Sequence, residues 1–99
     1  MASLRVGIVG LPDQISVLVP ILQSLNIQVT AIWSKGDDTR RKLANKYHLP
    51  FLSGGFHELL VCSDVDLVYV ATEPRLQAEL AVKALTSGKH CICQRPPST

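Results

Sequence analysis

The residues best suited to chemistry form the turn Gly10-Leu11-Pro12-Asp13-Gln14, which follows the largely apolar run of residues 4–9. After this turn, apolar residues recur every three or four positions, as on one face of a helix. They are Ile15, Leu18, Val19, Leu22 and Leu25. This pattern predicts a strand, a tight turn and a helix. In a parallel sheet the first N–H groups of such a helix face the carboxyl edge, where they bind anions such as a pyrophosphate.

The glycine spacing in this turn departs from the G-x-G-x-x-G or G-x-G-x-x-A pattern of dinucleotide-binding turns. Gly10 fills the first position, whereas Pro12 and Ile15 replace the second and third. Pro12 has no N–H to donate, and Asp13, a good helix N-cap, adds negative charge beside a bound pyrophosphate. Losing one charge-assisted hydrogen bond weakens binding by about ten- to a hundredfold. Two interpretations follow: a weakened pyrophosphate site, or an ordinary connection between a strand and a helix.

Composition favours one small globular domain. The chain has 99 residues, of which 46% are hydrophobic and 18% charged, as expected of an ordered fold. A net charge of +2 does not indicate a nucleic-acid partner, and the basic run Arg40-Arg41-Lys42 is expected to be a solvated helix face. No apolar run approaches the roughly 18 residues of a membrane span. A cytoplasmic location is expected, with secretion as the alternative.

The three cysteines are expected to be buried free thiols. Cys91 and Cys93 fall on the same face of a predicted strand. The spacing of the cysteines matches neither a zinc knuckle nor a redox C-x-x-C.

Apolar runs alternate with helical patterns along the whole chain. Strands are predicted near residues 4–10, 27–33, 51–52, 67–71 and 89–93, with helices between them. Such alternation predicts a Rossmann-like, doubly wound α/β fold with a parallel sheet of about five strands in the order 3-2-1-4-5. The predicted domain covers residues 1–93, and residues 94–99 form a Pro-rich extension.

Three stretches carry a resemblance to the N-terminal nucleotide-binding domain of the Gfo/Idh/MocA oxidoreductases, namely residues 6–10, 64–74 and 81–93. The resemblance spans nearly the whole chain. The segments Ala31-Ile32-Trp33 and Val19-Pro20-Ile21-Leu22 are most similar to the subgroup of glucose-fructose oxidoreductase domain-containing proteins. The family resemblance implies a dinucleotide-binding domain that is truncated before the family's second domain.

Several cofactor contacts are implied by this resemblance. Members of the family place the pyrophosphate over the turn from Gly10 to Gln14. Ser34 and Lys35 fall at the position that selects between NAD and NADP. An acidic residue there bonds the ribose hydroxyls, whereas Ser34, Lys35 and Arg40 would receive a 2′-phosphate. NADP is therefore the expected cofactor, with NAD as the alternative; a solvated loop lysine is the other interpretation of Lys35.

The resemblance extends to a loop beneath the adenosine and nicotinamide halves of the cofactor. Thr72, Glu73 and Pro74 match the family's Thr-x-Pro motif there. The family's next histidine is Gln77 in this chain, and its Glu-Lys-Pro motif reads Gln94-Arg95-Pro96. Arg95 does not release a proton near neutral pH, but it can hold an anionic group or the carboxamide. Gln77 and Arg95 are therefore expected cofactor contacts without an acid or base role.

No counterpart of the family's second domain, which supplies the substrate pocket and the catalytic histidine and aspartate, is found in these residues. We therefore expect no catalytic and no metal site, and an NAD(P)-binding module that is inactive by itself. The alternative is a protein-interaction or scaffolding domain that has lost the cofactor. Self-association or a partner protein is expected at the surface where the second domain would pack. The resemblance implies a family of NAD(P)-dependent oxidoreductases, but the missing second domain and the replacement of Glu-Lys-Pro by Gln94-Arg95-Pro96 leave enzyme activity unassigned.

Overall fold

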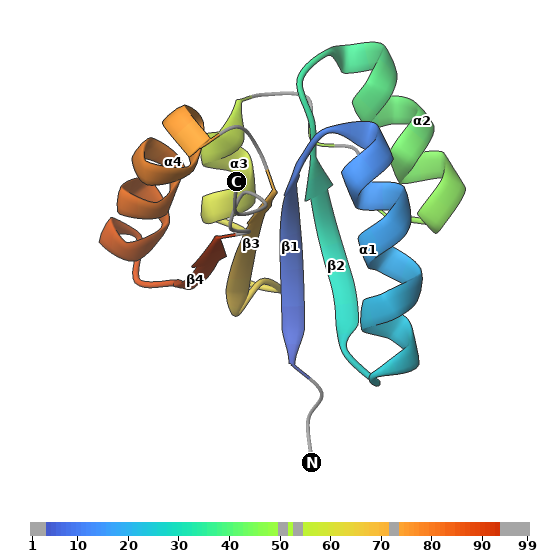
Figure 1. Cartoon of the computed structure of the whole chain (residues 1–99), viewed down its shortest axis with the longest axis horizontal. Coiled ribbons are helices and arrows are strands. Elements are labelled where there is room, and N and C mark those ends of the chain that lie inside the picture. The colour runs from blue at the N-terminus through green and yellow to red at the C-terminus, as the bar shows by residue number, and fades with distance from the viewer. Residues whose placement is uncertain (1–3, 50–51, 53–54, 72–73, 94–99) are drawn as a thin grey trace, which may run out of the picture.

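The computed structural model describes residues 4–49, 52, 55–71 and 74–93. Strands and helices alternate over most of this length (Figure 1). The elements are β1 (Arg5–Gly10), α1 (Pro12–Ser24), β2 (Gln28–Trp33), α2 (Asp37–Tyr47), α3 (Phe56–Leu60), β3 (Leu67–Ala71), α4 (Pro74–Thr86) and β4 (His90–Cys93).

The strands pair side by side in one parallel sheet, in the order β2-β1-β3-β4. Helices α1 and α2 cover one face of the sheet, and α3 and α4 cover the other (Figure 1). The predicted Rossmann-like, doubly wound parallel architecture is confirmed. Because all strands run the same way, their carboxyl ends share one edge, at the top of Figure 1.

The predicted five strands in the order 3-2-1-4-5 are wrong for the described residues, which contain four. The expected third strand was placed at Phe51 and Leu52. Phe51 lies outside the described residues, and Leu52 belongs to no strand. The Leu52 carbonyl oxygen accepts a hydrogen bond from Arg40 Nε at 2.7 Å, so a side chain occupies an acceptor that a neighbouring strand would use. Without this third strand, the predicted order becomes the observed one.

The core has two parts, one on each face of the sheet, as the alternation of side chains along a strand requires. From β1, Val6 and Ile8 pack under α1 together with Ile15 and Val19. The opposite face carries Val9, Val68 and Val70 with the apolar side chains of α3 and Ala84 of α4. The continuous run Leu67–Ala71 therefore forms an inner strand, as predicted.

Helix α1 begins earlier than an N-cap at Asp13 would place it. The N-cap is Leu11, Pro12 is the first helical residue, and Asp13 lies inside the first turn. Pro tolerates this position because the missing N–H has no partner within the helix. The helix continues through Pro20, as expected from its apolar face. Helix α2 has Gly36, with φ of 96°, as its N-cap.

The structure corrects two predictions about side-chain exposure, those for Arg40 and Cys93. Arg40 was expected on a solvated face, yet it is only 7% exposed, because its guanidinium packs on Trp33 and bonds to backbone carbonyls. Cys93 was expected to be buried, yet it is exposed on the last described strand, while Cys62 and Cys91 are half-buried. All three are free thiols.

Among the described residues, no helix is both long and apolar enough to cross a membrane. The same part of the chain contains no group of three His, Cys, Asp or Glu side chains placed to hold a metal ion.

Candidate functional site

The turn after β1 lies at the carboxyl edge of the sheet, between the ends of two neighbouring strands. Val9 pairs with Trp33 at the end of β2, and Gly10 pairs with Ala71 at the end of β3. From β1 the chain crosses to β2 on one side, while β3 lies on the other. This reversal of direction is where open α/β sheets bind ligands. The structure therefore brings the predicted turn to the expected place in the fold.

Gly10 is required by close packing between β1 and β3. A Cβ atom at this position would lie 2.6 Å from the carbonyl oxygen of Ala71, a distance that real side chains do not adopt. Both strands would have to separate to admit any other residue. The first position of the glycine pattern therefore has a structural cause that does not depend on a ligand.

Free backbone donors remain at the start of α1 despite Pro12. In a helix the first N–H groups lack a partner four residues earlier, and the bond from Ile15 N to Leu11 O, at 3.0 Å, is the first of the helix. Pro12 removes one donor and leaves those of Asp13 and Gln14. Leu11, Pro12, Asp13 and Gln14 are all exposed. This edge can hold an anion, with fewer donors than a turn with glycine at the second position.

Ile15 occupies the third glycine position for a packing reason. Its side chain is fully buried, between α1 and the β1 residues Val6 and Ile8. In a dinucleotide-binding turn a glycine here permits a close helix-to-strand contact. In this chain a large apolar side chain fills that space and joins the core.

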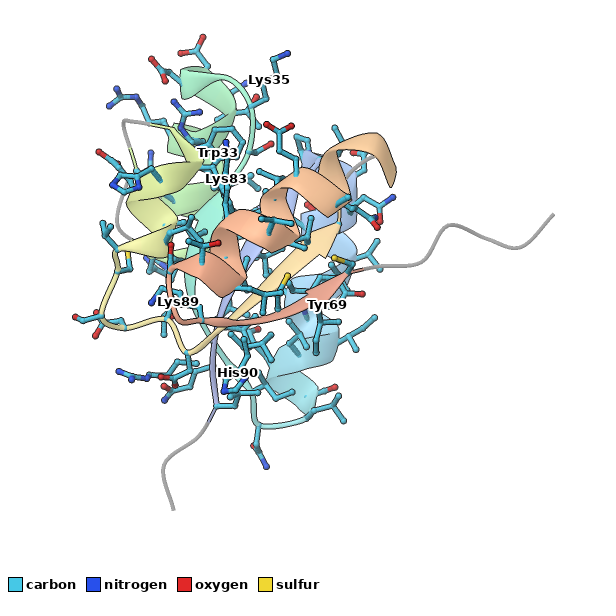
Figure 2. The ribbon with its side chains drawn as sticks, turned by 90° about the vertical axis from the view of Figure 1, so that its left-hand side faces the viewer. Trp33, Lys35, Tyr69, Lys83, Lys89 and His90 are labelled. Carbon is cyan, nitrogen blue, oxygen red and sulfur yellow. The ribbon has the colours of Figure 1, made fainter. Side chains whose placement is uncertain are left out.

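The β2–α2 loop, defined here as residues Ser34, Lys35 and Gly36, follows β2 at the same edge. Ser34 is buried, with 2% of its surface exposed, whereas Lys35 is exposed. Lys35 lies at the outer rim of the molecule, beyond Trp33 (Figure 2). Gly36, with φ of 96°, lets the chain turn into α2. Of the three residues predicted to receive a 2′-phosphate, Lys35 presents its side chain to solvent, whereas Ser34 and Arg40 are buried.

Arg40 lies beneath this loop and is bound to the protein on several sides. Its Nε donates to the Leu52 carbonyl at 2.7 Å, and its Nη1 donates to the Ser34 carbonyl at 2.8 Å. Its Nη2 forms an ion pair with the Asp37 carboxylate. Its guanidinium lies 5.3 Å from the centre of the Trp33 ring, a cation–π distance. Arg40 therefore holds the end of β2, the β2–α2 loop and the start of α2 together.

The remaining predicted contacts belong to the segment after β3. Pro74 is the first residue of α4, and Gln77 is half-buried in the first turn of that helix. The Gln77 carbonyl oxygen lies 4.0 Å from Cys93 Sγ, which links α4 to the end of β4. Thr72, Glu73 and Arg95 fall outside the described residues.

Asp37 was not among the residues expected at the site. Its pairing with Arg40 follows the i, i+3 spacing of helical ion pairs, a signal that was available in the sequence. Trp33 was likewise missed as the ring on which the guanidinium rests, because no sequence pattern indicates that contact.

A hollow on the surface lies elsewhere in the described structure. It has a volume of about 520 Å³ and lies between α3 and the C-terminal half of α4. Its lining includes the apolar side chains of Phe56 and Leu60 together with His57 and Lys83. Since α4 runs back from the carboxyl edge, this hollow is remote from the turn after β1. Strand topology, not this hollow, therefore locates the candidate site.

A family model for an oxidoreductase family with an NAD-binding Rossmann fold matches residues 4–99. The chain belongs to the Gfo/Idh/MocA oxidoreductase family. The match covers almost the whole sequence and agrees with the parallel sheet described above. The domain is thus the NAD-binding Rossmann domain of this family, and the predicted membership is confirmed.

Relatives of known name include the predicted subgroup. The chain is 33% identical over 90 residues to the human glucose-fructose oxidoreductase domain-containing protein 2, covering 91% of this chain and 23% of that protein. It is 34% identical over 90 residues to the mouse glucose-fructose oxidoreductase domain-containing protein 1, again covering 91% of this chain and 23% of that protein. The chain spans about a quarter of the length of these relatives.

Solved structures agree with the fold. A 3-ketoreductase from Actinomadura kijaniata, in complex with TDP-benzene and NADP, is 32% identical with a TM-score of 0.80, covering 99% of this chain and 31% of that one. The WlbA dehydrogenase from Bordetella pertussis, in complex with NADH and UDP-GlcNAcA, has a TM-score of 0.87 over 96% of this chain and 29% of its own. At 15% identity, the second shows the fold alone.

Proposed function

We propose that this domain binds a nicotinamide dinucleotide at the carboxyl edge of its sheet, with NADP preferred to NAD. The pyrophosphate would lie over residues 10–14, and the adenosine ribose beside the β2–α2 loop. The observation that carries the proposal is the common placement of the exposed turn after β1 and of exposed Lys35 after β2 on one edge. The 3-ketoreductase in complex with NADP, at 32% identity, supports the same class of ligand.

The residues present fit this ligand in part. The N–H groups of Asp13 and Gln14 and the exposed edge of the turn suit an anion, and Lys35 suits a 2′-phosphate. Pro12 and Asp13 weaken the pyrophosphate contact, so we expect modest affinity. Thr72, Glu73, Pro74, Gln77 and Arg95 complete the proposed contact set, as the family resemblance implies.

The bound dinucleotide would supply hydride chemistry, but we propose that this chain alone catalyses no such reaction. Relatives about four times as long carry sequence that has no counterpart here. No catalytic residue is assigned to the described part of the chain. Turnover of a sugar or diol by this chain by itself would contradict this proposal.

The proposed preference is tested by titrating the protein with NADPH and NADH while following nicotinamide fluorescence. We expect saturable binding, tighter for NADPH. Lys35→Ala should weaken NADPH binding by about tenfold, the effect of one charge-assisted contact, and leave NADH binding unchanged. Lys42→Ala, which removes another exposed lysine from α2, is the matched control. A folded protein that shows no saturable signal at millimolar NADPH would refute the proposal.

We also propose self-association or a protein partner, because several large apolar side chains are exposed. Val17, Ile21 and Leu25 of α1 are 62%, 50% and 63% exposed, and Ile92 of β4 is 48% exposed. Contiguous exposed apolar patches on a protein surface are typical of interaction sites. Size-exclusion chromatography over a range of concentrations should show that the oligomeric fraction increases with protein concentration. A monomer at every concentration would contradict this.

The scaffolding alternative, in which the cofactor has been lost, is favoured by the rigid Pro12 at the start of α1 and by buried Ile15. It predicts that no substitution in the turn restores dinucleotide binding. We place the domain in the cytoplasm as a further proposal, since its three cysteines are free.

A further inference from the structure

The ion pair between Asp37 and Arg40 joins an exposed carboxylate to a buried cation. Asp37 is 70% exposed at the start of α2, whereas the Arg40 side chain is 7% exposed. The two residues lie one helical turn apart, directly after the β2–α2 loop. The carboxylate is therefore exposed two residues after Lys35 in the chain, and its countercharge approaches from inside the protein.

Arg40 is unable to swing away from Asp37 as an exposed arginine would. The Leu52 and Ser34 carbonyls hold its Nε and Nη1 at 2.7 and 2.8 Å, and the Trp33 ring lies against its guanidinium. Exposed ion pairs open readily because two long side chains lose freedom in them. Here the cation is already immobilised by other contacts, so the pair persists.

The charge state of this position matters to a dinucleotide. In Rossmann domains, a free carboxylate after the second strand accepts hydrogen bonds from the ribose hydroxyls of NAD and repels the 2′-phosphate of NADP. Asp37 supplies such a carboxylate close to that point of the chain, but the fixed guanidinium neutralises it. Lys35, exposed in the adjoining loop, is then the charge that a 2′-phosphate meets.

We propose that Arg40 is a positioning residue for cofactor choice: by neutralising Asp37, it makes the site favour NADP over NAD. The inference rests on the proposed function, that a dinucleotide binds at this edge. It changes the role of Arg40 from a direct phosphate ligand to a buried countercharge. Asp37, not Ser34, becomes the latent ribose-binding group.

The experiment measures dissociation constants for NADPH and NADH by nicotinamide fluorescence, with thermal melts to verify folding. Arg40→Gln keeps amide donors for the carbonyls but removes the charge. We expect the preference for NADPH over NADH to fall by about tenfold, the effect of one charge-assisted contact. Arg40→Lys, which keeps a cation, should retain the preference. In the double variant Arg40→Gln with Asp37→Asn, the preference for NADPH should return. In the control double variant Arg40→Gln with Asp38→Asn, which makes the same charge change one residue later, the preference should stay low.

A purely structural role for Arg40 predicts that Arg40→Gln weakens both cofactors equally and leaves their ratio unchanged, which would overturn the inference. Failure of Asp37→Asn to restore the ratio would do the same. If the Arg40→Gln protein does not fold, the single variant Asp37→Asn tests the inference by its affinity for NADH. NADH affinity should then stay within about threefold of wild type, because the neutralised carboxylate contributes no ribose contact; a loss of about tenfold overturns the inference. Absence of wild-type binding to either cofactor would instead refute the proposed function.

Discussion

Gly10 and Ala71 lie so close together that the carbonyl oxygen of Ala71 is 2.6 Å from where a Cβ atom on Gly10 would be. The contact is between backbones of adjacent parallel strands, and a backbone cannot rotate out of the way as a side chain can. We expect Gly10→Ala to lower the free energy of unfolding by about 1–3 kcal/mol, as overpacking of a core does.

Chemical denaturation followed by circular dichroism checks this expectation. Gly55→Ala is the matched control, since a Cβ there has no atom within 4 Å and should change stability by less than about 0.5 kcal/mol. Equal stability of the Gly10→Ala protein and wild type would show that β1 and β3 separate at little cost.

A second prediction concerns Arg5 and Asp66, which join the beginnings of β1 and β3. Arg5 donates from Nε and Nη2 to the two Asp66 carboxylate oxygens at 2.9 and 2.8 Å. These hydrogen bonds hold the pKa of the Asp66 carboxyl below its ordinary value of 3.8. A lowered pKa in the folded state contributes stability that is complete above the ordinary value and is lost as pH falls through the folded one.

We therefore expect Asp66→Asn to lower the melting temperature at neutral pH, with the difference from wild type shrinking below about pH 4. Asp64→Asn should have a smaller effect, because Asp64 is 77% exposed and lies 3.6 Å from Arg5 Nη1. Thermal melts at a series of pH values measure both. A difference that stays constant down to acid pH would exclude the ion pair as its source.

The third prediction separates the two defects that Pro12 brings to the turn. Pro12→Ala restores a backbone N–H, whereas Pro12→Gly also removes the side chain. If the dinucleotide site is merely weakened, each change should tighten NADPH binding, and glycine should do so by about tenfold or more. Calorimetric titration with NADPH measures both variants. A turn that responds to neither substitution favours the scaffolding alternative.

The fourth prediction concerns thiol reactivity on β4. Burial, and then the adjacent Cys93 thiol, raise the pKa of Cys91 to about 11, so Cys91 carries little thiolate near neutral pH. Cys93 is exposed on the same strand. Because the thiolate is the reactive form, limited alkylation at about pH 8 should label Cys93 well before Cys91, as read by peptide mass spectrometry.

Raising the pH toward the pKa of Cys91 should narrow that difference in labelling, because more of Cys91 becomes thiolate. Equal labelling of the two cysteines at the lower pH would contradict the burial that the structure gives Cys91.

Much of the fold was predictable because local patterns and packing agree. The β-branched run Leu67–Ala71 and the helical spacing from Ile15 to Leu25 correspond to β3 and α1. The sequence did not reveal that Leu52 lies outside any strand. The Leu52 carbonyl accepts a hydrogen bond from Arg40, a residue twelve positions earlier. A short apolar segment has no local sign of such a partner.

The site was predictable in position but not in its internal contacts. Gly10 and Lys35 lie at the expected edge of the sheet because parallel strands end together. Arg40 resembled a solvated helix residue because it adjoins Arg41 and Lys42, and only its packing on Trp33 reveals its burial. Sequence periodicity locates a side chain on a helix face, but it does not identify which residues from other segments cover that face.

Trp33 is the sole tryptophan of the chain. It contacts the Arg40 guanidinium and makes an edge-to-face contact with Phe56, the two ring centres lying 6.4 Å apart. The chain therefore contains one indole fluorophore, at the end of β2, where the proposed adenosine contact begins. Its emission reports the local environment of that single position, without the averaging that several indoles would cause. Any rearrangement of the β2–α2 loop should be visible as a spectral change in unlabelled protein.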